Sequence, residues 1–222
     1  MPPTEDITST IGYSMALMVC SSLLAEVGAA LYGLIVGYNL QQKEVHRAVS
    51  SVMWTVGVLA VVLAVLGIAS PVWLKLKADN QTFGLWQWCV TILDAPRKCL
   101  SLTGNEFVEQ FKKAIEYRVA QALAIVGAVV LAISVLLSLL TTCILKQNVI
   151  VKVVVLALYI LAGVLLLATI IDYFATMLKV TEDYKVNFSV AMMTFSAVAT
   201  GVAAVFEAVL LGDLMAASGC FA

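Results

Sequence analysis

Five long stretches of apolar residues, each nearly free of charge, restrict the structures that this chain can form. They run over residues 11–38, 52–70, 119–145, 150–172 and 186–212. A bilayer core about 30 Å thick is crossed by about 20 helical residues, so each stretch is long enough to span it. Because hydrocarbon offers no partners to backbone polar groups, each span must be helical. The sequence therefore predicts an all-α membrane bundle.

The composition agrees with a membrane protein and disfavours other classes. Only 12% of the 222 residues are charged, whereas soluble domains carry about 25%. The net charge of −1 indicates no nucleic-acid partner, and membrane lipids are the expected surroundings. His46 is the single histidine, and no phosphate loop or nucleophile motif appears. We therefore expect no enzyme, no cofactor and no metal site.

The first stretch, residues 11–38, has one feature against a membrane span and one in favour. Glu26 lies near its centre. Small residues recur every four positions and form a face that suits close helix packing in a membrane. They are Ser21, Ala25, Ala29, Gly33 and Gly37. We expect a spanning helix inside an N-terminal extension, residues 1–51; the alternatives are a re-entrant or interfacial segment and a signal peptide.

The longest connection, residues 71–118, is expected on the extracellular side. It holds two cysteines and a glycosylation sequon at Asn80, and both features favour that side. Period-two alternation after Pro71, with Trp73 and Leu74 on opposite faces, predicts one strand. The aromatic run FGLWQWCVTIL predicts a second strand. Together they predict a small antiparallel sheet with a glycosylated hairpin tip, and the residues from 103 to 116 predict an amphipathic helix.

Cys89 and Cys99 bracket a short polar segment of this connection. A disulfide between them would stabilise the sheet by roughly 2–3 kcal/mol. Two free thiols are the alternative, and a zinc site is disfavoured because two cysteines without histidines fill only half of a tetrahedron.

Basic residues indicate which connections face the cytoplasm. Lys43 and Arg47 precede the second stretch, and Lys146 and Lys152 flank the start of the fourth. Cytoplasmic loops are rich in such residues, so these segments are expected inside the cell. Residues 213–222 then form a short cytoplasmic tail.

Three acids lie in or beside the apolar stretches, at Glu26, Asp172 and Glu207. Acids inside a membrane are functional by default. We find no buried Lys or Arg opposite them, and Asp172 and Glu207 lie toward helix ends that water or headgroups can reach. We therefore expect structural or interfacial roles for these two, and a pairing of Glu26 across a helix interface in an oligomer.

A pattern in the large connection combines a tryptophan, a Gly-Leu-Trp triplet and two cysteines. Its members are Trp73, Gly84, Leu85, Trp86, Cys89 and Cys99. It resembles the W–GLW–C–C signature of the claudin superfamily, which includes claudins, the peripheral myelin and epithelial membrane proteins, and γ-type channel subunits. Arg118, at the start of the third span, resembles an arginine found there in claudins. The resemblance covers residues 52–212.

The resemblance implies a left-handed claudin-like four-helix bundle with a small extracellular antiparallel β-sheet, to which the first stretch adds an extra N-terminal transmembrane helix. It implies a disulfide between Cys89 and Cys99, and it implies that Trp73 and Trp86 pack the sheet onto the bundle. The short interval between Trp73 and Gly84 looks more like the myelin and epithelial membrane protein branch.

The resemblance also implies a multi-pass protein of the plasma membrane, acting at cell-cell junctions in adhesion or as a paracellular barrier. Its partner would be a second copy of itself, through lateral assembly. The alternative is an auxiliary subunit that docks on an ion channel and changes its gating or trafficking. A small transporter that uses Glu26 is a third hypothesis.

Overall fold

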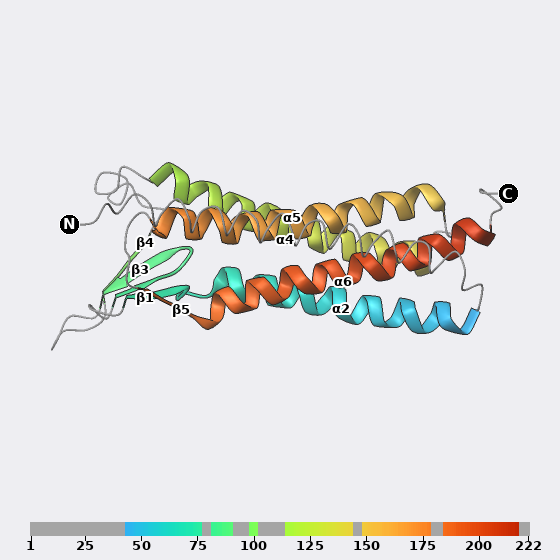
Figure 1. Ribbon diagram of the computed structural model, residues 1–222, viewed down its shortest axis with the longest axis horizontal. Coiled ribbons are helices and arrows are strands. Elements are labelled where there is room, and N and C mark those ends of the chain that lie inside the picture. The colour runs from blue at the N-terminus through green and yellow to red at the C-terminus, as the bar shows by residue number, and fades with distance from the viewer. Residues whose placement is uncertain are drawn as a thin grey trace, which may run out of the picture.

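The computed structural model describes residues 43–76, 81–90, 98–101, 114–143, 148–178 and 184–217. Within these ranges the chain forms long helices and short strands (Figure 1). The helices are α2 (Lys43–Ala69), α4 (Ala114–Cys143), α5 (Val149–Leu178) and α6 (Phe188–Ala217). The strands are β1 (Leu74–Leu76), β2 (Gln81–Phe83), β3 (Gln87–Val90), β4 (Lys98–Ser101) and β5 (Tyr184–Val186).

Each of these helices contains a run long and apolar enough to cross a membrane. The runs are Val49–Ala69, Arg118–Thr142, Val149–Met177 and Phe188–Ala217. At 1.5 Å per residue, a helix such as α6 is about 45 Å long and exceeds the hydrocarbon core of a bilayer. The four later stretches predicted from the sequence each form such a helix, so the chain is a multi-pass membrane protein.

Large apolar side chains lie on the outside of the bundle as well as in its interior. Leu136 of α4 is 59% exposed, whereas Leu131 of the same helix is fully buried. Helix α2 packs mainly against α6, and α4 packs against α5. Buried alanines such as Ala60 and Ala197 allow α2 and α6 to approach closely. A surface of this kind suits lipid, which replaces water as the solvent of the outward side chains.

The helices alternate in direction, and the sheet lies at one end of the bundle (Figure 1). At that end α2 and α5 finish while α4 and α6 begin. The strands are arranged in the order β4-β3-β2-β1-β5, and each neighbouring pair is antiparallel. Leu74 of β1 lies between Phe83 of β2 and Val186 of β5, so the segment before α6 completes the sheet.

The second strand predicted from the sequence is wrong as a single element, because β2 and β3 divide it. The amide of Gly84 donates to the carbonyl of Gln87 at 2.8 Å and closes a tight turn between them. The predicted alternation after Pro71 also fails at its start, since Trp73 and Leu74 are both buried. Trp73 precedes β1, so the alternation of side chains along a strand does not apply to it.

Several predictions concern residues outside the described ranges. These are the first span at 11–38 with Glu26, Ala25, Ala29, Gly33 and Gly37, the sequon residue Asn80, and most of the predicted helix at 103–116.

Candidate functional site

Near the end of α2, the carbonyl of Gly67 has no backbone N–H to accept from, because the residue four positions later is Pro71. Proline has no N–H group, so it cannot donate to the carbonyl of Gly67 four residues earlier. The indole Nε1 of Trp73 donates to that carbonyl instead, at 2.9 Å. The indole Nε1 of Trp86 donates to the next carbonyl, that of Ile68, at 2.8 Å. Two tryptophans of the sheet region therefore complete the end of a membrane helix.

The ring of Trp73 also joins the sheet to α5. It is fully buried, and its centre lies 4.7 Å from the ring centre of Tyr173. The Tyr173 hydroxyl donates to the carbonyl of Phe83 at 3.3 Å, and the backbone amide of Trp73 donates to the same carbonyl at 2.7 Å. A single carbonyl of β2 thus links α5 and the segment before β1.

The Gly-Leu-Trp turn fits closely between α2 and α4. A Cβ at Gly84 would lie 2.6 Å from the carbonyl carbon of Pro71, which is backbone and cannot move aside. Only glycine fits this approach. Leu85 is fully buried, and its carbonyl accepts a hydrogen bond of 2.7 Å from the buried side-chain amide of Gln121 in α4.

The start of α6 is fastened to the residues that follow α2. The backbone amide of Asn187 donates to the carbonyl of Trp73 at 3.0 Å, and its side-chain amide donates to that of Val72 at 3.3 Å. The hydroxyl of Ser189 also binds the carbonyl of Val72. Asn187, Phe188 and Ser189 also form a second glycosylation sequon. Its polar groups are used to hold the sheet region on the bundle.

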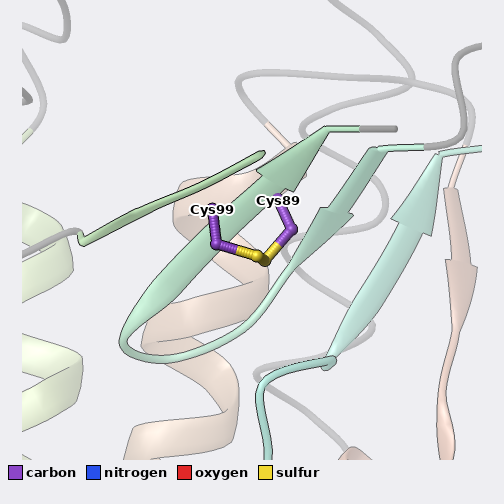
Figure 2. Close-up of a disulfide and its surroundings, with 2 residues drawn as sticks. All are labelled: Cys89 and Cys99. Atoms are coloured by element: carbon purple, nitrogen blue, oxygen red, sulfur yellow. A yellow bond between two sulfur atoms is a disulfide. The ribbon is translucent and has the colours of Figure 1, made fainter. Parts of the chain in front are cut away.

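The disulfide expected between Cys89 and Cys99 is present (Figure 2). The two residues lie directly opposite each other in β3 and β4. Cys89 is buried and Cys99 is exposed, so the bond fastens the outer strand of the sheet to its interior. Trp73, Gly84, Leu85 and Trp86 meet at the junction of sheet and bundle, whereas the side chain of Arg118 is exposed.

A second polar group lies inside the bundle, away from the sheet. Nζ of Lys152 in α5 lies 2.9 Å from Oε1 of Glu207 in α6, and the two side chains are 4% and 0% exposed. The hydroxyl of Ser138 in α4 lies 3.1 Å from Oε2 of Glu207 and 3.7 Å from the sulfur of Met53 in α2. The hydroxyl of Tyr159 is hydrogen-bonded to Ser138. Each of the described helices contributes a residue.

The expectation that no basic residue lies opposite the acids is therefore wrong for Glu207. Its side chain is buried rather than at the headgroups, and Lys152 neutralises it. The long lysine side chain enters the bundle from near the start of α5, which sequence spacing alone does not show. The available signal was a pair of opposite charges near the same end of two antiparallel helices. Asp172 is half-buried in α5.

No family model matches the chain, and no curated protein has a matching sequence. Among the residues that the structure describes, no three His, Cys, Asp or Glu side chains are grouped as metal ligands would be. The contacts described above join the helices to one another and the sheet to the helices. They fix the position of the sheet on the end of the bundle.

Proposed function

We propose that the chain is a claudin-like protein of cell-cell contacts, which acts in adhesion or as a paracellular barrier. The observation that supports this proposal is the attachment of a disulfide-linked sheet to one end of a membrane bundle by Trp73 and Trp86. The attaching residues are those of the W–GLW–C–C pattern. The plasma membrane, and its junctions in particular, is the location that this role requires.

An ordered outer surface favours contact with a partner. A surface that is already ordered loses little conformational entropy when it meets a partner. Here the sheet and the residues next to it are held by hydrogen bonds to α2, α4 and α6, and by ring packing against α5. A contact made by the sheet is therefore made by the whole bundle, and copies aligned in one membrane would present their sheets together.

Lateral assembly has a suitable surface in the exposed apolar helix faces. The large rings of Phe188 and Phe195 in α6 are 66% and 63% exposed. Inside a membrane the hydrophobic effect does not drive these rings together, because lipid tails are as apolar as the rings. The rings can still pack against a neighbouring helix by van der Waals contact. The same surface suits a larger membrane protein, so an auxiliary subunit of an ion channel is the second candidate function.

Localisation and barrier measurements test the first function. We expect a tagged chain, produced in adherent epithelial cells that lack it, to concentrate at contacting borders and to change transepithelial resistance. The double variant Cys89→Ser/Cys99→Ser, compared at equal surface level, should lose this effect, while Gln87→Ala, on the exposed side of β3, should keep it. Uniform surface distribution with unchanged resistance would contradict the proposal. Stoichiometric co-purification with a channel and altered currents would favour the auxiliary subunit.

A further inference from the structure

The ion pair joins two helices that follow one another in the chain. Lys152 is the fourth residue of α5, at the end away from the sheet. Glu207 lies deeper, about 15 Å from the end of α6 at Ala217. Because α5 precedes α6, Lys152 must find surroundings for its charge before Glu207 is in place.

A lysine near the end of a membrane helix has such surroundings available. Its long side chain can extend to the aqueous boundary and keep the ammonium group hydrated. The carboxylate of Glu207 is too short and too deep to do the same. We propose that the Lys152–Glu207 pair is an assembly lock: Lys152 faces the boundary until α6 packs against α5, and then turns inward and fixes the relative depth of the two helices.

Neutral residues of α2, α4 and α5 form the position that the lysine enters. Ser138 of α4 binds the second oxygen of Glu207, and Tyr159 binds Ser138. A Cβ at Gly57 of α2 would lie 3.2 Å from the Tyr159 hydroxyl, so glycine gives this chain of hydroxyl groups its room. The carboxylate is thus oriented by neutral groups, and Lys152 supplies a positive charge that neutralises it.

A lock of this kind follows from the energetics of buried charges. Removal of one partner of a buried pair leaves an uncompensated charge and is strongly destabilising, whereas replacement of both by apolar side chains is often neutral. The pair therefore favours one packing of α5 on α6 over packings displaced along the helix axis, in which the two charges would not meet.

Amine labelling of the full-length chain in open membrane fragments, in which the reagent reaches both faces, tests the position of Lys152. We expect a water-soluble amine-reactive reagent to leave Lys152 unmodified in the wild type, as measured by peptide mass spectrometry. The Glu207→Gln variant should release the lysine and raise its labelling by about tenfold or more. Asp213→Asn, a change of another acid in α6, should leave Lys152 protected. Lys75, exposed on β1, serves as the labelled reference.

Thermal unfolding in detergent tests the neutralisation itself. Lys152→Met leaves the deep carboxylate of Glu207 without its partner and should lower the melting temperature more than Glu207→Gln, whose lysine can return to the aqueous boundary. The double variant Lys152→Met/Glu207→Leu should restore the melting temperature to near the wild-type value. Labelling is scored only on the fraction that elutes at the wild-type volume in size-exclusion chromatography after extraction, so that misfolding is not counted as release. Equal labelling of Lys152 in the wild type and Glu207→Gln would overturn the proposal. A double variant no more stable than Lys152→Met would also overturn it. The proposal would fail as well if the wild type carried protons into liposomes, the variants did not, and every variant were as stable as the wild type.

Discussion

Trp73 and Trp86 show how one side chain can serve both packing and hydrogen bonding at the edge of a membrane. Their rings fill the space between sheet and bundle, and their N–H groups bind the two carbonyls at the end of α2. The sequence singles out both residues through the W–GLW–C–C pattern. Their hydrogen-bond partners could not be predicted, because they depend on how Pro71 ends the helix.

Replacement of Trp73 by phenylalanine keeps a large ring but removes the donor to Gly67. We expect Trp73→Phe to lower the free energy of unfolding by about 1–3 kcal/mol, the cost of a buried carbonyl left without a partner. Thermal unfolding in detergent, followed by circular dichroism, measures the change. Trp54→Phe in α2 is the control, because Nε1 of Trp54 is buried without a hydrogen-bond partner among the described residues. An equal loss in both variants would mean that ring volume, not the hydrogen bond, matters at position 73.

At the scale of elements, helices and strands differ in how far the sequence predicts them. The spans follow from length and apolar character alone, which leave few alternatives in a membrane. Strands β4 and β5 were not predicted, since each has only three or four residues and depends on partners far along the chain. The ion pair between α5 and α6 was missed for a related reason, because helix rotation and depth decide which side chains meet.

The disulfide belongs to the sheet rather than to the bundle. We expect Cys89→Ser/Cys99→Ser to destabilise the sheet by about 2–3 kcal/mol, because the unfolded connection gains conformational freedom. Limited proteolysis of membranes should then cleave the region of β3 and β4 faster, while the helical circular dichroism signal stays unchanged. A parallel loss of helical signal would show that the bundle itself needs the bond.

At the scale of the whole molecule, the outward face of the bundle is expected to contact lipid. Leu131 and Leu136 of α4 provide a matched comparison, since the first is fully buried and the second is 59% exposed. We expect Leu131→Ala to lower the free energy of unfolding by about 2–5 kcal/mol through the cavity that it leaves. Leu136→Ala should change it by less than about 1 kcal/mol, because lipid fills the space. Similar losses at both positions would indicate a second protein surface against Leu136.

Two sequons test on which side of the membrane the sheet lies. Asn80 belongs to the connection between β1 and β2, and Asn187 donates two hydrogen bonds to the residues after α2. We expect a glycosidase that removes N-linked glycans to increase the mobility of the wild-type chain on gels. Asn80→Gln should abolish the shift, and Asn187→Gln should leave it intact. A chain without any glycan shift would remove the support that the sequon gives to an extracellular sheet.

The hydrogen bonds from the two indoles to α2 have a mechanical consequence. Without them, the short link 70–72 would carry alone any force between that corner of the sheet and α2. With them, a force applied to the sheet is passed directly into the axis of a membrane-spanning helix. Strain on the sheet would thus be borne by the membrane-embedded body of the protein before the link is stretched.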